Sequence, residues 1–161
     1  MQAADYVREL QLEAHPEGGW YAEIFRSELR IFPEGFSGKR AASTAIYFLL
    51  ERGQFSALHR IKSDEVWHFY DGDVLEIMEI DLNGELICTQ LGRNILKGEQ
   101  LCYTVKAGHW FGSRPAEGSA FSLVGCTVAP GFDFSDFDMP ARDFFLQEFP
   151  QHTGIIRAIT R

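Results

Sequence analysis

The sequence predicts a mainly β protein, built as a β-sandwich or barrel with a short helix near each end. Two observations support this prediction. From Ala42 to Val128, short segments rich in β-branched and aromatic residues alternate with glycine-bearing turns. Fourteen phenylalanines supply aromatic side chains of the kind that fill the interior of sheet proteins. The length of 161 residues predicts one domain over residues 1–161.

The N-terminal part of the chain contains a helix, a turn, a strand and a loop. Apolar residues recur at helical spacing within residues 3–12, which predicts a short helix. Pro16 and the pair Gly18–Gly19 interrupt the backbone and predict a turn. The sequence WYAEIFRSE, residues 20–28, then predicts a strand. Two glycines and a proline in residues 31–40 predict a loop.

A series of strands follows, and a second helical region closes the chain. The Asn83–Gly84 dipeptide is the strongest hairpin signal. Apolar residues at helical spacing in residues 141–149 predict a helix that Pro150 ends, and residues 153–160 predict a short helix or turn. The predicted strands cover residues 43–50, 55–61, 65–70, 74–80, 86–91, 100–105, 109–113 and 120–128.

Composition argues against several classes of partner. The net charge of −8 and the lack of a Lys/Arg cluster argue against nucleic acid. No basic and apolar leader opens the sequence, and no apolar run approaches the roughly 20 residues that span a bilayer. We therefore expect a cytoplasmic protein with no membrane partner. The odd cysteine count, Cys88, Cys102 and Cys126, favours reduced thiols.

One stretch carries a recognisable spacing of histidine, glutamate and glycine. Gly53, His59, Glu65 and Gly72 fit the pattern G-x5-H-x-H-x3-E-x6-G, except that Ile61 stands at the second histidine. This pattern resembles the first motif of the cupin superfamily. The later segment KAGHWFGSRP, residues 106–115, resembles the second cupin motif. There Lys106 stands for the proline, and Phe111 stands for the metal-binding histidine.

The wider sequence resembles the DUF985 (Cupin_5) family of small cupins. The matching segments are HPEGGWY, STAIYFLL, SALHRIKSDEVWHFYDGD, AGHWFGS and SLVGCTVAPGFDFSDF, in this order. The resemblance implies a double-stranded β-helix jelly roll of the RmlC-like type, with strands wound as a β-barrel. It also implies a homodimer, and the need to cover sheet edges favours the same expectation. It implies no established reaction.

A tight metal site is not expected, and we predict no cofactor. The resemblance implies two histidines and a glutamate from the first motif and one histidine from the second as metal ligands. Of this set, only His59 and Glu65 remain, because Ile61 and Phe111 cannot donate to an ion. Weak binding of a divalent metal by His59 and Glu65 stays open. Strand alternation predicts that His68 points away from the face of Glu65, unless a bulge reverses it. His109 is two positions from Phe111 and can share its face, although it lies near a turn.

A metal-free pocket is the alternative, as in the dTDP-sugar epimerases, which share the jelly roll. His59 has an ordinary pKa near ~6.5, which suits a base, and Glu65 is placed to orient its ring. We therefore hypothesise an epimerase or isomerase acting on a sugar, nucleotide-sugar or organic acid. Two other interpretations are open: a non-catalytic ligand-binding cupin, and a metal-dependent enzyme with a reduced ligand set. Structural packing is the plain alternative for each residue.

Further residues are candidates for ligand binding. His15 and Glu17 lie in a glycine turn that can lean over a pocket mouth. Arg26 and Arg40 are candidates for holding a carboxylate or phosphate. The Asp-rich loop at residues 130–138 is interpreted as a solvated loop whose phenylalanines cover the barrel or a dimer contact. The complete set of candidate ligand-binding residues is His15, Glu17, Arg26, Tyr47, His68, Tyr103 and Phe111.

Overall fold

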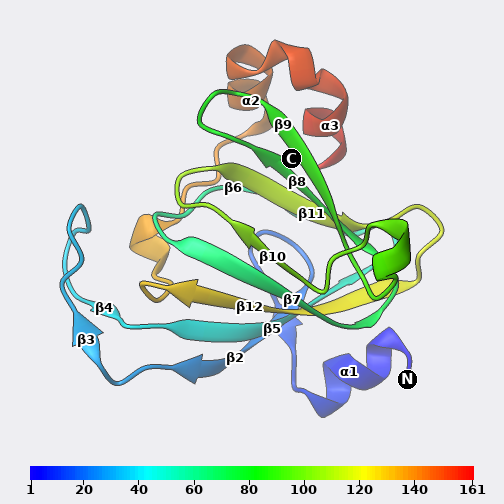
Figure 1. Cartoon of the computed structure of the whole chain (residues 1–161), viewed down its shortest axis with the longest axis horizontal. Helices are drawn as coiled ribbons and strands as arrows, with labels where there is room; N and C mark the ends of the chain where they lie inside the picture. The colour runs from blue at the N-terminus through cyan, green and yellow to red at the C-terminus, as the bar shows by residue number, and fades with distance from the viewer.

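Two antiparallel sheets face each other across a common core (Figure 1). The computed structural model describes residues 1–161. The six-stranded sheet has the order β1-β2-β5-β12-β7-β10 and contains β1 Glu13–Ala14, β2 Trp20–Arg26, β5 Thr44–Glu51, β7 Asp64–Gly72, β10 Cys102–Val105 and β12 Phe121–Ala129. The four-stranded sheet has the order β6-β11-β8-β9 and contains β6 Ser56–His59, β8 Leu75–Ile80, β9 Leu86–Leu91 and β11 Trp110–Pro115.

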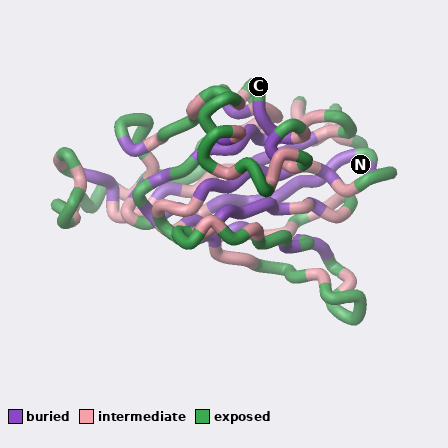
Figure 2. Tube along the Cα trace, turned by 90° about the horizontal axis from the view of Figure 1, so that it is seen from above, coloured by how far each residue is buried: buried purple, intermediate pink, exposed green.

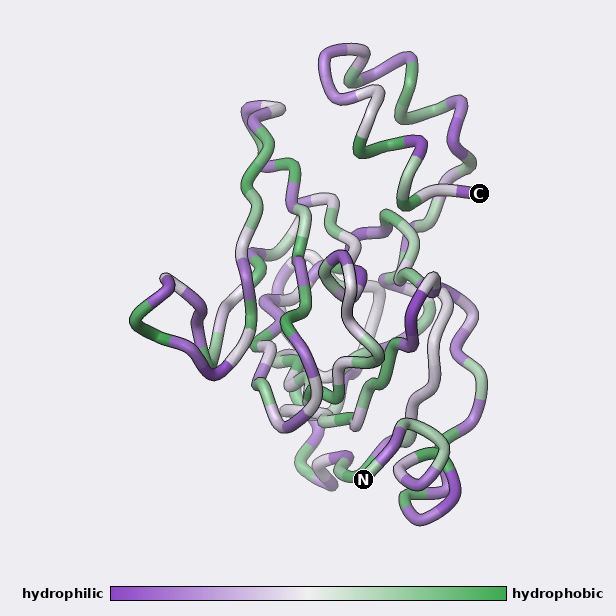
Figure 3. The backbone as a smooth tube through the Cα atoms, turned by 90° about the vertical axis from the view of Figure 1, so that its right-hand side faces the viewer, coloured by the Kyte–Doolittle hydropathy of each residue, from purple (hydrophilic) through white to green (hydrophobic).

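The strands form where the sequence predicts them. The hairpin at Asn83–Gly84 is confirmed, because Ile80 pairs with Leu86 across it and Gly84 has a φ of 81°. Hydrophobic and hydrophilic residues alternate along the chain where it runs as strands (Figure 3). The mainly β class is therefore confirmed.

Three helices cover the outer faces of the sheets. α1 (Ala3–Glu9) packs against the six-stranded sheet, whereas α2 (Arg142–Glu148) and α3 (Thr153–Ala158) lie beyond the four-stranded sheet (Figure 1). Pro150 follows α2 and opens a short 3₁₀ turn, as expected of a residue that cannot continue a helix. No helix has the length and apolar character that a membrane span requires.

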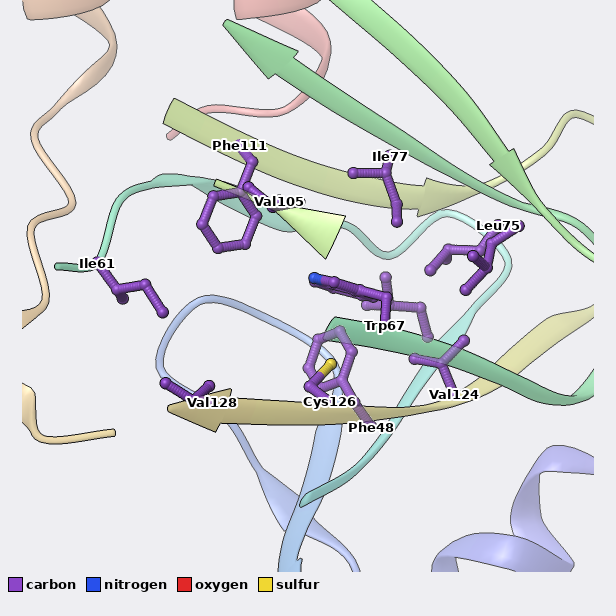
Figure 4. Packing of buried hydrophobic residues seen from close by; sticks show 12 residues of the cluster. Phe48, Ile61, Trp67, Leu75, Ile77, Val105, Phe111, Val124, Cys126 and Val128 are labelled. Carbon is purple, nitrogen blue, oxygen red and sulfur yellow. The ribbon is translucent and has the colours of Figure 1, made fainter. Parts of the chain in front are cut away.

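Side-chain alternation on β8 shows how the core is divided. Ile77 faces the other sheet, whereas Met78 and Ile80 pack against the C-terminal helices. Between the sheets, Phe111 from β11 and Trp67 from β7 project toward each other, with ring centroids 6.3 Å apart (Figure 4). Both rings are fully buried, so Phe111 fills the interior at this level.

An arm leaves the body between β2 and β5. β3 (Arg30–Ile31) and β4 (Arg40–Ala41) pair within it, so the predicted loop begins and ends in a small two-stranded sheet. Phe32 in this arm is 74% exposed. The buried residues concentrate in the strands of the body, and exposed ones in the turns and loops (Figure 2).

Arg40 does not serve as the free anion-binding residue that the sequence suggested. Its guanidinium forms a buried bidentate ion pair with Asp136, with nitrogen–oxygen distances of 2.6 and 2.9 Å. In the same loop, Asp138 pairs with Arg60, and Asp133 accepts the amide of Ser135. Asp136 and Asp138 therefore tie the loop to other segments, and its phenylalanines pack together beside the core.

Candidate functional site

A cavity of about 370 Å³ opens between the two sheets. Its inner end gathers four titratable residues: His15 and Glu17 from the turn before β2, His59 at the end of β6, and Glu65 on β7. All four side chains are less than one-tenth exposed. Apolar walls complete the cavity, among them Ile46, Ile61 and Val128.

The glycine turn brings Glu17 into this site. Gly18 and Gly19 have φ values of 115° and 76°, which side chains rarely tolerate. A Cβ on Gly18 would also lie 2.1 Å from the carbonyl oxygen of Phe55, so only glycine allows the turn to approach β6 this closely. The Ala57 amide then donates to the Glu17 carbonyl at 2.8 Å. The turn is thereby held against β6, next to His59.

His59 has both ring nitrogens engaged by the protein. Nδ1 lies 2.7 Å from the Ala57 carbonyl oxygen, which can only accept, so Nδ1 carries a hydrogen. Nε2 lies 3.1 Å from Oε2 of Glu17. Burial lowers the pKa of His59 and raises that of Glu17. One proton is therefore shared between Glu17 and His59, and burial favours the neutral acid–imidazole form.

This geometry corrects the expected pairing of His59. Glu17, rather than Glu65, is the carboxylate in direct contact with the imidazole. Glu65 acts on His59 through its charge. The ring of His59 also packs on Phe111, with centroids 4.2 Å apart, which fixes its orientation.

Glu65 is the second proton-exchanging group of the cavity. Burial raises its pKa to about 7, and the negative charge of Glu17 adds to this effect, while His59 opposes it. A carboxyl group with this pKa changes its protonation state near neutral pH. The neighbouring thiol of Cys126, which sequence reasoning did not single out, has its pKa raised well above the ordinary value by burial.

His15 is held in one tautomer by the turn that carries it. The amide of Glu17 donates to His15 Nδ1 at 3.2 Å, so this nitrogen presents its lone pair and Nε2 carries the hydrogen. Burial lowers the pKa of His15. In the neutral form, His15 therefore adds an N–H donor to a site otherwise dominated by carboxyl groups.

The residues present do not fit a tight metal site. No group of three or more His, Cys, Asp or Glu side chains has an arrangement that holds an ion. At the two positions where the motif resemblance implied ligands, Ile61 forms part of the cavity wall and Phe111 packs against His59. Weak binding of a divalent ion by His59 and Glu65 stays a prediction.

Arg26 lies at the cavity mouth, and three of its five N–H donors are bonded within the protein. Its guanidinium forms two hydrogen bonds with the Glu23 carboxylate, at 2.9 and 2.6 Å. The remaining nitrogen donates to the carbonyl of Phe132 at 3.2 Å. An incoming anion would meet a guanidinium whose charge is already paired with Glu23.

Four other predicted ligand-binding residues do not line the cavity. His68 bonds with Thr127 at 3.2 Å on the outer face of β7, as strand alternation predicts. Tyr47 packs against Tyr70 on that same outer face, with centroids 5.9 Å apart. The other two face the interior: Tyr103 donates to a buried carboxylate, and Phe111 fills the core.

That carboxylate, Glu79 on β8, belongs to a second buried pair that sequence reasoning missed. Tyr103 donates its hydroxyl to Oε2 of Glu79 at 2.6 Å, and His109 Nδ1 bonds to Oε1. The signal was present, because Leu75, Ile77 and Glu79 alternate along one strand and share the inward face.

Comparisons with known proteins assign the family. A model of the Cupin superfamily (DUF985) matches residues 4–140. A hypothetical protein from Leishmania major is 35% identical, with a TM-score of 0.93 and 99% of each chain covered. A protein from Shewanella oneidensis is 39% identical, with a TM-score of 0.92, covering 100% of this chain and 98% of that one. Among curated proteins, no sequence match is found.

More distant structures share the fold alone. A cupin 2 domain-containing protein from Halorhodospira halophila is 16% identical, with a TM-score of 0.58 over 92% of this chain and 87% of that one. Oxalate decarboxylase from Bacillus subtilis is 12% identical, with a TM-score of 0.57 over 91% of this chain and 36% of that one. The predicted cupin-type fold is thus confirmed, and the chain belongs to the DUF985 family of the cupin superfamily.

Proposed function

We propose that this cupin binds a small polar molecule in the cavity and catalyses proton transfer on it, as an epimerase or isomerase does. The observation that carries the proposal is the buried Glu17–His59 pair, together with Glu65, at the inner end of a 370 Å³ cavity. Cavities of a few hundred Å³ suit ligands of the size of a sugar.

The site has the two exchanging groups that isomerisation needs. One group takes a proton from the substrate, and the other returns one at a second position or on the other face, so no net proton is gained. Glu65 suits the first role because its pKa of about 7 leaves it partly ionised at neutral pH. Glu17 suits the second role because burial raises its pKa and favours the protonated acid. Transfer of that proton to the substrate breaks its hydrogen bond to His59 Nε2.

His59 thus acts as a partner of Glu17 rather than as a free base. Its Nδ1 is fixed by the Ala57 carbonyl, and its Nε2 faces Glu17. The imidazole can accept the proton of Glu17 when the carboxylate form is needed, and it can return that proton afterwards. The apolar walls Ile46, Ile61 and Val128 limit the access of water and strengthen these electrostatic effects.

Proton exchange in D₂O tests this proposal, and it does so even when the product is not identified. The wild-type protein is incubated with a panel of sugars, and deuterium incorporation at carbon is followed by NMR. We expect exchange on at least one sugar, with Glu65→Gln and Glu17→Gln abolishing it. His68→Asn is the matched control, because His68 lies on the same sheet but faces away from the cavity.

The outcomes separate the candidate functions. A ligand that binds in the cavity without deuterium exchange would assign the protein as a non-catalytic binding cupin. Exchange that appears only with an added divalent ion would assign a metal-dependent cupin enzyme. Exchange unchanged in both glutamine variants would contradict the roles given to Glu17 and Glu65.

Two broader expectations stay predictions. The homodimer is supported by the exposed apolar side chains of β2 and the arm, Phe25, Leu29 and Phe32. Light scattering tests it, and a monomeric mass would contradict it. The cytoplasmic location is supported by the three free cysteines.

A further inference from the structure

The mouth of the cavity carries more negative than positive charge. Three carboxylates line it, Glu13, Glu23 and Asp133, against one guanidinium, Arg26. Arg26 is ion-paired with Glu23 and also donates to a backbone carbonyl, so its positive charge is already matched by a carboxylate. Glu13 and Asp133 have no guanidinium hydrogen-bonded to them. The charge that a ligand meets on entry is therefore negative.

The inner end adds no positive charge to offset the mouth. Burial disfavours the charged forms of His15 and His59, and it disfavours those of Glu17 and Glu65 as well. When Glu65 does ionise near neutral pH, the cavity gains a further negative charge. A ligand carboxylate or phosphate finds no unengaged cation among the residues that line the cavity.

Aromatic rings accompany the mouth carboxylates. Tyr21, Phe132 and Phe134 all line the cavity, and Phe134 is 55% exposed there. The rings of Phe132 and Phe134 meet edge to face at 81°, with centroids 5.0 Å apart. Aromatic faces next to carboxylates are the environment in which organic ammonium groups bind, through cation–π and charge attraction.

We infer that the cavity selects a small organic cation, a molecule with an ammonium group at the mouth and its reacting part at the inner end. This inference rests on the proposed function and narrows its ligand class. Among the ligands expected from the sequence, an amino sugar fits, whereas nucleotide-sugars and organic acids meet the carboxylates of the mouth. Glu13 and Asp133 hold the ammonium group, and Phe134 covers it.

Three probes with one skeleton test the charge preference: benzylamine, benzyl alcohol and benzoate. Each is titrated into the protein, and the resonances of the His15 and His59 side chains are followed by NMR. We expect benzylamine to bind at least about fivefold more tightly than benzoate at low ionic strength, with the preference falling as salt is added. Benzyl alcohol is expected to lie between them.

Variants that each remove one negative charge test whether the carboxylates at the mouth cause the preference for benzylamine. Asp133→Asn keeps an oxygen for the Ser135 amide, and Glu13→Gln keeps the size of the side chain, so both preserve the local structure. Each is expected to reduce the preference for the amine about two- to threefold. Glu117→Gln is the matched control, because it removes the same charge from an exposed site outside the cavity and is expected to leave the preference unchanged.

Failure of the charge inference can be distinguished from failure of the proposed function. Benzoate or benzyl alcohol binding as tightly as benzylamine would overturn the charge inference and leave the proposed function standing. An equal effect of Glu117→Gln and Asp133→Asn would also overturn it, because net charge rather than the mouth would then be responsible. If no probe shifts the His15 and His59 resonances while a sugar undergoes deuterium exchange, the charge inference fails and the proposed function stands.

Discussion

Two buried imidazole–carboxylate pairs lie on either side of Phe111. In the four-stranded sheet, Phe111 on β11 pairs with His59 of β6 on one side and with Glu79 of β8 on the other. His59 meets Glu17, and Glu79 meets His109. The two pairs therefore have the same chemical groups and lie in one row across three strands.

The pairs differ in what surrounds the carboxylate. Both oxygens of Glu79 are occupied, one by the hydroxyl of Tyr103 and one by His109, and Glu79 is 2% exposed and lines no described cavity. Glu17 contacts His59 through one oxygen, and its other oxygen lies 3.8 Å from His15, within a cavity of 370 Å³.

This difference is the basis for the different roles that we propose for two similar pairs. A buried carboxylate with both oxygens bonded holds the segments that carry its partners together, and Glu79 does not line the cavity that a ligand would enter. A carboxyl group with a free side that faces a cavity can exchange its proton with whatever enters. Access and unused hydrogen-bonding capacity, more than residue type, distinguish the candidate site from the structural cluster.

The largest expected effect comes from removing the structural carboxylate. Glu79→Ala leaves the Tyr103 hydroxyl and His109 without their buried partner, so we expect a loss of roughly 3 kcal/mol in the free energy of unfolding. Urea unfolding measures it. Ligand binding by the folded fraction is expected to stay unchanged. A variant as stable as the wild type, or one that loses ligand binding while folded, would contradict the purely structural role assigned to Glu79.

Glu65 gives an effect of similar size, with a characteristic pH dependence. Folding raises the pKa of Glu65 from 4.5 to about 7, so the folded state holds this proton more tightly than the unfolded state does. The resulting stability is fully present below pH 4.5 and is lost as the pH rises through about 7. Glu65→Gln cannot ionise. We therefore expect the free energy of unfolding of the wild type to fall by roughly 3 kcal/mol relative to this variant across that range.

Chemical denaturation at several pH values measures this difference. The lowered pKa of His59 acts in the opposite direction, but it acts in both proteins, so the comparison largely removes it. A difference between the two proteins that does not change with pH would contradict the assignment of a raised pKa to Glu65.

Tyr103→Phe is the mildest test of the structural cluster. It removes one hydrogen bond to Glu79 while keeping the ring, so we expect a loss of about 1 kcal/mol in the free energy of unfolding. Tyr47→Phe is the matched control on the outer face, where no hydrogen bond of the hydroxyl is at stake. Equal losses of unfolding free energy in the two variants would show that the Tyr103 hydroxyl has no special stabilising role.

Local patterns in the sequence account for the fold. Alternation over a few residues places the strands, Asn83–Gly84 sets the hairpin, and Pro150 ends α2. The same alternation places His68 on the outer face. These properties depend on neighbours in the chain, and they can therefore be predicted from a single sequence.

The partners of the site residues depend on contacts between distant segments. His59 meets Glu17 only because the glycine turn docks on β6, and no local pattern specifies that contact. In the same way, Arg26 and Arg40 have the chemistry of anion ligands, but Glu23 and Asp136 occupy them. Sequence reasoning identified which residues enter the cavity more successfully than it identified which residues they pair with.

One NMR measurement tests the central claim most directly: that the cavity pair is functional and the closed pair is structural. Imidazole ¹⁵N resonances are recorded while benzylamine, or a substrate identified by deuterium exchange, is titrated into the wild-type protein. We predict that the resonances of His15 and His59 shift on binding and that those of His109 do not. Shifts at His109 with none at His59 would contradict the account.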